Sequence, residues 1–337
     1  MVRVGIIGLG FMGRMHYGAY QSVPDARIVA VCDADPRRAS GDLTDGWSNV
    51  PGADVKRLPM TQIRGTTSWQ DLIGWDDVDV IDVCLPTPQH LEVVSVAIAT
   101  GKHVLCEKPM ARTLAEGRAI AQAAAKSSGF FMPAMCMRFW SEWEWLKNAV
   151  ADNRFGKVQS ATFRRASNTP GGWFRDGKLS GGALLDLHVH DVDFVYHLFG
   201  KPRAVFSRGY SRDTGEIDHV VTQYLYDSPT IVCAEGAWGM ADGFGFRMQF
   251  TVNFERATAE YDFARQPPLH LYAAGKSESV NTSAQTGYVG ELRYFIDCVK
   301  NNTRPTRVTA DDAVAGLAII DAERRSVQTG QPVPVGE

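Results

Sequence analysis

Short apolar runs alternate with helical patterns over residues 1–137. Five runs are apolar on both faces, which is typical of buried strands in a parallel sheet: 2–8, 27–33, 78–86, 103–106 and 130–136. Three segments between them carry apolar residues at helical spacing: 11–23, 88–101 and 113–129. This alternation predicts an α/β fold, with a doubly wound parallel sheet as the first domain, over 1–137.

The pattern changes from residue 138 onwards. Six segments then alternate polar and apolar residues, as strands of an open antiparallel sheet do: 158–167, 204–211, 219–227, 230–238, 246–255 and 257–264. A last helix is predicted over about 309–329, with Thr309 as its N-cap and Gly330 near its end. We therefore predict a second α/β domain over 138–337, whose last helix packs back towards the first domain.

One segment, 41–64, has no clear period and is rich in glycine, proline and aspartate. We interpret it as an inserted surface loop. A solvated loop without a role is the simpler interpretation, and a contact with the cofactor or with an oligomer partner is the alternative.

Composition narrows the class of protein. The 337 residues carry a net charge of −3, with 45% apolar and 22% charged residues. Neither nucleic acid nor a membrane surface is an expected partner, because there is no basic field. No apolar run approaches the roughly 20 residues of a membrane helix, and no secretory signal opens the sequence. The six scattered cysteines form no CxxC pair, so we expect reduced thiols in a cytoplasmic protein.

The sequence GLGFMG, from Gly8 to Gly13, fits the G-x-G-x-x-G pattern between a predicted strand and a predicted helix. Gly8 permits a tight turn, Gly10 lets the backbone approach a pyrophosphate, and Gly13 allows the helix to pack closely on the strand. The helix N-terminus then offers N–H groups to the phosphates. This context predicts a dinucleotide site.

Asp33 ends the second run, 20 residues after the last glycine of the motif. A carboxylate at this place accepts hydrogen bonds from the ribose hydroxyls and repels a 2′-phosphate, which favours NAD over NADP. Arg37 and Arg38 follow closely and would weaken that preference if they reached the phosphate. The alternative is that Asp33 only caps the next turn.

The fourth run ends in Glu107-Lys108-Pro109. Ligands in doubly wound folds bind outside the carboxyl ends of the strands, so Lys108 is expected near the cofactor, as is the segment that begins at Pro86. Pro109 disfavours a helical conformation for Lys108 and permits a cis peptide bond. A lysine that is merely on the surface is the alternative.

A second cluster lies in GGALLDLHVHDVD, residues 181–193. In a helix that starts near Gly182, Asp186 and His190 are four residues apart and share a face, whereas His188 points elsewhere. Such a pair suits a base with its neighbour, a metal pair or a buried polar pair. We expect no metal, because the sequence has neither HExxH nor a set of cysteine ligands.

Together these residues suit hydride transfer from a secondary alcohol to nicotinamide. A neutral His190 can accept the hydroxyl proton, and the Lys108 ammonium can stabilise charge that develops on the oxygen. Asp186 can bind the substrate or relay the proton. Lys108 is the alternative base, because a positive nicotinamide favours loss of a proton from a neighbouring ammonium.

Several segments together resemble the Gfo/Idh/MocA oxidoreductases: GLGFMG, DADPRRA, CLPTPQHLEVVSVAIATGKHVLCEKPMA, GGWFRDGKLSGGALLDLHVHDVD and VTADDAVAGLAIIDAERRSVQTGQPV. The resemblance runs from end to end, and E-K-P followed by D-x-x-x-H is its most specific part. It implies an N-terminal Rossmann domain and a C-terminal α/β domain with a large, mostly antiparallel open sheet. It also implies a homodimer or homotetramer assembled through that sheet.

The resemblance also implies roles for individual residues. Three are implied to be catalytic: Lys108, Asp186 and His190. The cofactor is implied to contact the glycine loop, the end of the second strand, the loop after the third and the end of the fourth: Gly8, Gly10, Phe11, Met12, Gly13, Asp33, Arg38, Leu85, Pro86, Thr87, Pro88, His90, Glu107 and Lys108. The substrate is implied to contact Arg138 and Trp173 besides the three catalytic residues. His188 departs from the family, because many members carry a small residue there.

The sequence thus favours an NAD-dependent dehydrogenase that acts on a sugar, a sugar acid or a cyclic polyol such as an inositol. The alternative is a glycosidase, lyase or epimerase that retains NAD and uses only a transient redox step. A cofactor-binding sensor has no need of Lys108, Asp186 and His190, which argues against that third class.

Overall fold

The computed structural model describes residues 1–45 and 54–336. It divides into two compact units, of which the first combines Met1–Phe139 with Gln285–Ala313 and the second combines Trp140–Ala284 with Val314–Glu337. The segment 285–313 thus groups with the first unit by its contacts. The domain boundaries at 1–137 and 138–337 stay a prediction.

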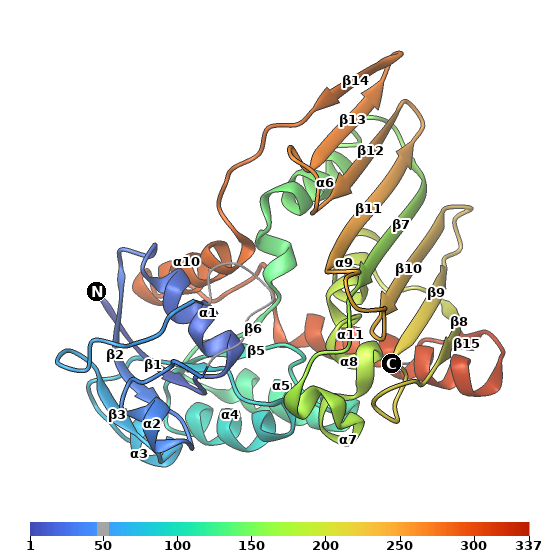
Figure 1. Ribbon diagram of the computed structural model, residues 1–337. Helices are drawn as coiled ribbons and strands as arrows, with labels where there is room; N and C mark the ends of the chain where they lie inside the picture. The colour runs from blue at the N-terminus through green and yellow to red at the C-terminus, as the bar shows by residue number, and fades with distance from the viewer. Residues whose placement is uncertain (46–53, 337) are drawn as a thin grey trace. The chain divides into compact units, whose positions relative to one another are not determined.

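The first unit is built on a six-stranded parallel sheet (Figure 1). Its strand order is β3-β2-β1-β4-β5-β6, so β1 lies at the centre with the chain wound outwards on both sides. The strands are β1 (Val2–Ile7), β2 (Ala26–Cys32), β3 (Arg64–Thr66), β4 (Val80–Val83), β5 (His103–Glu107) and β6 (Phe131–Ala134). The doubly wound parallel sheet is confirmed, while β3 was not predicted.

Helices cover both faces of this sheet (Figure 1). One face carries α1 (Phe11–Tyr20) and α10 (Gly287–Lys300), which contact each other. The other face carries α3 (Trp69–Ile73), α4 (His90–Ala99) and α5 (Leu114–Lys126). Thr113 and Glu116 form a capping box that starts α5, which satisfies N–H groups that a helix start leaves open.

The segment 41–64 is more than the solvated loop that its composition suggested. Leu43 is fully buried, Leu58 and Ile63 are nearly so, and Asp42 forms a short bridge with Arg57. The described parts of the segment therefore pack into the first unit, since isolated apolar side chains gain from burial. Residues 46–53 lie outside the described residues.

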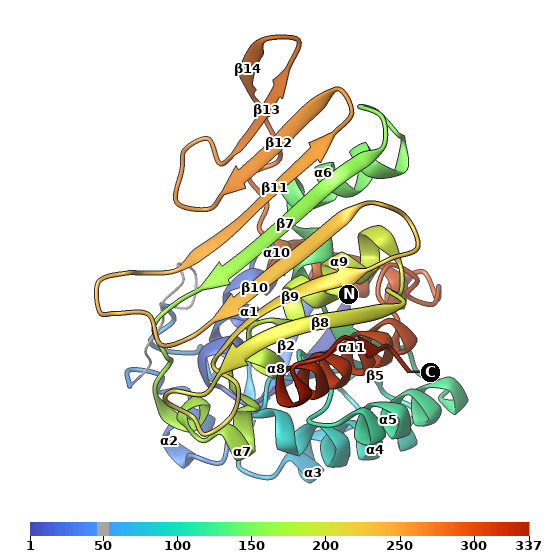
Figure 2. The same ribbon diagram turned by 90° about the vertical axis from the view of Figure 1, so that its right-hand side faces the viewer.

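The second unit is built on a nine-stranded sheet in the order β14-β13-β12-β11-β7-β10-β9-β8-β15 (Figure 2). All neighbours are antiparallel except β7 and β10, so the predicted mostly antiparallel sheet is confirmed. The strands are β7 (Val158–Ala166), β8 (Ala204–Tyr210), β9 (His219–Leu225), β10 (Ile231–Ala237), β11 (Arg247–Phe254), β12 (Ala257–Asp262), β13 (Leu269–Ala273), β14 (Lys276–Ser279) and β15 (Val333–Pro334). The last three were not predicted.

The core of the second unit lies between this sheet and its helices. Trp143, from α6 (Ser141–Ala151), is fully buried and packs edge-on against Phe194, from α9 (Val189–Phe199), and against Phe250. Aromatic pairs in this arrangement add to the gain from buried area. The packed layer holds α9 against the sheet, and α9 carries His190.

The last helix, α11 (Ala310–Thr329), begins as predicted. The Thr309 hydroxyl accepts from the backbone N–H of Asp312 at 3.1 Å, and the Asp312 carboxylate accepts from the Thr309 N–H at 2.9 Å. Among the described residues, no helix combines the length and apolar character that crossing a bilayer demands. None of the six cysteines, all of which the structure describes, forms a disulfide, and five of them are buried.

Candidate active site

The glycine loop joins β1 to α1 and is shaped by two close backbone approaches. Gly8 adopts a φ of +95°, and a Cβ at Gly13 would overlap the carbonyl oxygen of Gly8. Apart from its chain neighbours, no atom of the described residues lies within 4 Å of a Cβ built at Gly10. The loop thus leaves open space at its middle glycine, in front of the N-terminus of α1, where a pyrophosphate is bound in such folds. The loop therefore fits a dinucleotide.

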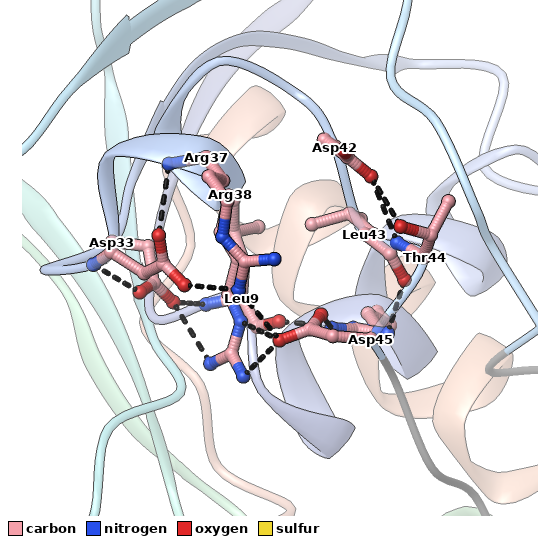
Figure 3. A network of polar contacts seen from close by, with 10 residues as sticks. Leu9, Asp33, Arg37, Arg38, Asp42, Leu43, Thr44 and Asp45 are labelled. Carbon is pink, nitrogen blue, oxygen red and sulfur yellow. Dashed lines mark hydrogen bonds and ion pairs between the residues drawn. The ribbon is translucent and has the colours of Figure 1, made fainter.

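Asp33 lies directly after β2 and is fixed by two backbone N–H groups. Its Oδ2 accepts from Leu9 N at 2.8 Å and its Oδ1 accepts from Asp35 N at 2.9 Å (Figure 3). Leu9 belongs to the glycine loop, so the carboxylate and the loop are positioned together. The side chain is 11% exposed, which leaves it accessible to a hydroxyl donor.

Arg38 and Asp45 lie beside Asp33 (Figure 3). Arg38 comes from α2 (Pro36–Ala39) and donates to Asp45 Oδ2 through Nε at 3.1 Å and Nη2 at 2.8 Å. Its Nη1 is 3.9 Å from Asp33. The hydrogen bond from Arg38, with that from Arg14, lowers the pKa of Asp45 to about 2. Arg37 is paired with Asp35 at 2.8 Å and also lies 3.5 Å from Asp45 Oδ2.

Lys108 follows β5, at the same sheet edge as the glycine loop that follows β1. Both strands are parallel members of one sheet, so their carboxyl ends face the same way. Lys108 is half-buried, and the Lys108–Pro109 peptide bond is cis. The Lys108 backbone N–H donates to Glu107 Oε2 at 3.0 Å. The sheet thus brings the predicted lysine and the predicted cofactor loop to one edge.

A buried ionic network centred on His16 of α1 includes Glu107, the residue before Lys108. His16 Nδ1 is 2.9 Å from Asp82 Oδ2, and His16 Nε2 is 2.9 Å from Glu107 Oε1. Burial opposes charge on this imidazole, but the Asp82 carboxylate and Cys84 raise the pKa of His16 well above its usual value. The histidine is therefore an imidazolium between two carboxylates, one of which holds the amide of Lys108.

Glu291, from α10, completes this network. Its Oε1 lies 3.9 Å from His16 Nε2, and neither of its carboxylate oxygens has a hydrogen-bond partner among the described residues. Burial raises the pKa of Glu291 well above its usual value, and the neighbouring Glu107 and Asp82 add to the effect. The neutral form of Glu291 is therefore favoured in the folded protein.

The same side chains have the spacing of metal ligands. His16 with Asp82 and Cys84, and His16 with Glu107 and Glu291, each place their ligand atoms within 4.8 Å of one another. Both sets share His16, and its raised pKa shows that the acids around it favour a positive charge at this place.

The loop after β4 carries the residues predicted to pass the nicotinamide. Thr87 is buried in the short turn Thr87–Gln89, whereas Pro88 is exposed and Leu85 and Pro86 are half-buried. His90 is fully buried and contacts the carbonyl oxygens of Leu85 at 2.8 Å and Pro109 at 3.0 Å. His90 thus joins this loop to the E-K-P turn. Its contact with the cofactor stays a prediction.

Two predicted substrate contacts have protein neighbours. Arg138 is 4% exposed, and its guanidinium donates to the Arg307 carbonyl at 2.9 Å and to Asp312 at 3.2 Å. Trp173 is half-buried and stacks on Phe174 with ring centroids 4.2 Å apart. A role of either residue in binding substrate stays a prediction.

The predicted helix over the second cluster is interrupted, so the expectation of one continuous helix was wrong. Asp186 ends α8 (Gly182–Asp186), and His190 belongs to α9 (Val189–Phe199). Between them the N–H groups of Leu187 and His188 both donate to the Ala183 carbonyl, at 3.0 and 2.8 Å. The winding therefore loosens by one residue at this point, as in a π-type turn. Asp186 is buried and His190 is half-buried.

His188 sits at this break and enters a second buried cluster. Its Nε2 is 3.4 Å from Glu323 Oε1 of α11 and 3.3 Å from the Tyr224 hydroxyl of β9. Burial opposes charge here too, but Glu323 raises the pKa of His188. A Cβ at Gly236 would lie 2.6 Å from the Cβ of His188, so the histidine fills the space that the glycine leaves. His188 therefore points into the unit, away from the predicted face.

Four participants were missed in the sequence: His16, Asp82, Glu291 and Asp45. Asp82 carried a signal, because it is an acid in the middle of an apolar strand, a position that demands a buried partner. The other three lie at ordinary positions in amphipathic or irregular segments, where a charged residue is usually solvated.

Comparison with known proteins agrees with this architecture. Residues 2–135 match the oxidoreductase family with an NAD-binding Rossmann fold, and residues 143–260 match the GFO/IDH/MocA C-terminal domain. The inositol 2-dehydrogenase of Rhizobium meliloti (strain 1021) is 25% identical over 99% of this chain and 99% of its own length. The scyllo-inositol 2-dehydrogenase (NAD(+)) of Bacillus subtilis (strain 168) is 24% identical over 98% and 96%.

Among solved structures, levoglucosan dehydrogenase in complex with NADH and levoglucosan superposes with a TM-score of 0.86. It covers 100% of both chains at 21% identity, a level that shows the fold alone. The two matched domains span most of the chain, and the glycine loop, the E-K-P turn and the two sheets lie where the resemblance predicts them. The chain belongs to the Gfo/Idh/MocA oxidoreductase family.

Proposed function

We propose that this protein is an NAD-dependent dehydrogenase that oxidises a secondary alcohol of a sugar, a sugar acid or a cyclic polyol. The observation that carries the proposal is the common sheet edge of β1 and β5, which places the glycine loop and Lys108 on one side. The inositol dehydrogenases among the relatives support the substrate class.

NAD would be held by the glycine loop at its pyrophosphate and by Asp33 at its adenosine ribose, and it would accept a hydride at its nicotinamide. Lys108 then holds the substrate oxygen, and its ammonium stabilises negative charge there as the hydride leaves. His190 or Lys108 takes the hydroxyl proton, and Asp186 binds the substrate or passes that proton on. The Glu107 carboxylate fixes the backbone of Lys108 by accepting a hydrogen bond from its N–H group.

The first experiment is to measure NADH formation by the purified protein with inositols, aldoses, sugar acids and anhydrosugars, and to run NAD and NADP in parallel. Stoichiometric NADH with one substrate class is the expected result. NAD that copurifies with the protein, together with no NADH from any substrate, would contradict the proposal and favour an enzyme that retains its cofactor.

Asp33 is proposed to set the preference for NAD. Replacement of Asp33 by Ala removes an acceptor for the ribose hydroxyls, so NADH should bind about tenfold more weakly, while NADPH should gain relative to NADH. The ratio of the two dissociation constants, measured by fluorescence titration, checks this. An unchanged ratio would show that Asp33 only fixes Leu9 and Asp35.

The second unit is proposed to mediate a homodimer or homotetramer. Tyr210, Val221 and Ile231 are large exposed side chains on β8, β9 and β10, and alternation along these strands places them on one face of the sheet. Exposed apolar side chains gathered on one face favour association. Light scattering of the wild type and of Val221→Lys tests this, since a charge at the interface should lower the measured mass.

A further inference from the structure

The adenosine end of the cofactor site holds a closed ring of polar contacts, which Figure 3 shows. Leu9 N donates to Asp33, Arg38 lies 3.9 Å from Asp33, and Arg38 donates twice to Asp45. The ring returns through Arg14, which donates to Asp45 Oδ1 at 2.8 Å and to the Leu9 carbonyl at 3.0 Å. Asp45 thus connects the glycine loop to the arginine beside Asp33.

Arg14 anchors Asp45 in this ring. Its side chain is 3% exposed, and its Nη1 also donates to the Leu43 carbonyl at 2.6 Å. A guanidinium that is buried and bonded in this way has little freedom to move, so the carboxylate that it binds is fixed as well. Asp45 therefore holds Arg38 from a rigid base, although Arg38 itself is 30% exposed.

The charges explain what this arrangement does. A 2′-phosphate adds about two negative charges next to the ribose, and an arginine near the end of the second strand is the group that receives it in NADP-binding folds. Here Arg37 is paired with Asp35 at 2.8 Å and lies 3.5 Å from Asp45, whereas Arg38 is paired with Asp45 at 2.8 Å. Both guanidiniums already have carboxylate partners, so a 2′-phosphate would have to displace one of them.

We propose that Asp45 is a specificity-determining residue that keeps Arg38 from binding the 2′-phosphate of NADP. This inference rests on the nicotinamide-cofactor site proposed above. It adds a second acid to the selectivity of Asp33: Asp33 repels the phosphate directly, whereas Asp45 occupies the cation that would attract it.

The test is a set of fluorescence titrations of the full-length protein with NADH and with NADPH, without substrate. Asp45→Asn should tighten NADPH by about tenfold, the effect of about one charge-assisted hydrogen bond, and change NADH by less than about threefold. The double variant Asp45→Asn with Arg38→Gln should lose the gain, because it lacks the guanidinium that was released.

Asp42→Asn is the matched control. Asp42 lies in the same segment, but it accepts from the N–H and the hydroxyl of Thr44, at 3.1 and 2.7 Å. The NADPH-to-NADH ratio should stay at the wild-type value in this variant. An equal shift with Asp42→Asn would overturn the proposal, since a general loss of negative charge would then explain the result.

Two other results would also overturn it: an unchanged ratio in Asp45→Asn, or an equal change for both cofactors. If Asp45→Asn does not fold, the single variant Arg38→Gln, which keeps Asp45, provides the test. The ratio should then change less than about twofold, because Asp45 already occupies the guanidinium, and a tenfold loss of NADPH affinity would contradict the proposal. Failure of the wild type to bind either cofactor would instead reject the nicotinamide site itself.

Discussion

Each of the two units holds a fully buried histidine that contacts carboxylates, and the comparison of these two sites separates a network that supports the proposed chemistry from one that supports the fold. His16 in the first unit and His188 in the second are both 0% exposed, both contact glutamates, and both have a raised pKa. Their surroundings differ in the number of acids and in what those acids hold.

His16 faces three carboxyl groups, from Asp82, Glu107 and Glu291. Glu107 in turn accepts from the amide of Lys108, so the histidine is one residue from a proposed catalytic group. A change at His16 should therefore reach the active site through Glu107.

His188 has fewer acidic partners than His16. Its partner Glu323 also lies near the Tyr224 hydroxyl, and the neighbouring Asp191 is already paired with Arg165 at 2.9 Å. His188 lies at the break between α8 and α9 and contacts α11. It therefore positions the backbone rather than a reacting group. The two buried histidines thus have different roles, and the neighbouring side chains determine the role of each.

The largest expected effect is that of Lys108→Ala. Loss of the ammonium removes the stabilisation of charge on the substrate oxygen, so kcat should fall roughly 100- to 1000-fold, while NADH affinity changes little. Steady-state kinetics and cofactor titration measure the two quantities. Lys126→Ala, at the exposed end of α5, is the control, and turnover unchanged by Lys108→Ala would remove the chemical role of the first site.

The next effect is on stability. His16→Gln leaves two buried carboxylates without a cation and should destabilise the first unit by about 3 kcal/mol, whereas His188→Gln should cost the second unit about 1 to 2 kcal/mol. Hydrogen exchange resolves the two units separately, which a single unfolding curve does not. Equal losses in the two units would contradict the larger role assigned to the acids around His16.

The smallest effect is a pH dependence. A pKa raised in the folded state means that His16 contributes its full stability below its usual pKa of about 6.5 and loses it as the pH rises through the folded pKa. Burial lowers the pKa of His90, so this residue changes the stability of the first unit only below its usual pKa of about 6.5. The first unit should therefore lose stability as the pH rises above about 6.5, and His16→Gln should flatten that slope.

Glu291 sharpens this test. Its raised pKa has the same sign, because the neutral acid is favoured in the folded state and its contribution is lost as the pH rises. Glu291→Gln imitates the neutral acid, so this variant should gain stability relative to the wild type as the pH increases. Hydrogen exchange at pH 6.5, 7.5 and 8.5 measures both slopes, and parallel curves for wild type and variant would exclude a neutral Glu291.

Much of the fold could be predicted from the sequence, because local patterns of apolar and polar residues encode it. The apolar runs, the glycine motif and the spacing to Asp33 predicted the parallel sheet and one edge of it, and the alternation after residue 138 predicted six strands of the second sheet. The short strands β3 and β15, β13 with its single buried position and the exposed β14 were missed, since a strand with few residues or few buried positions has no clear period.

The order of the elements and the residues at the strand ends could therefore be predicted from the sequence alone, because hydrophobic period and backbone chemistry act over a few neighbouring positions. Which charges share a site depends on the tertiary structure. His16, Asp82, Glu107 and Glu291 come from four elements as far apart as residues 16 and 291, and His188, at the break before His190, contacts Glu323 of α11. A buried charge needs a partner, but its own sequence neighbourhood does not say which one, since packing brings that partner from elsewhere in the chain.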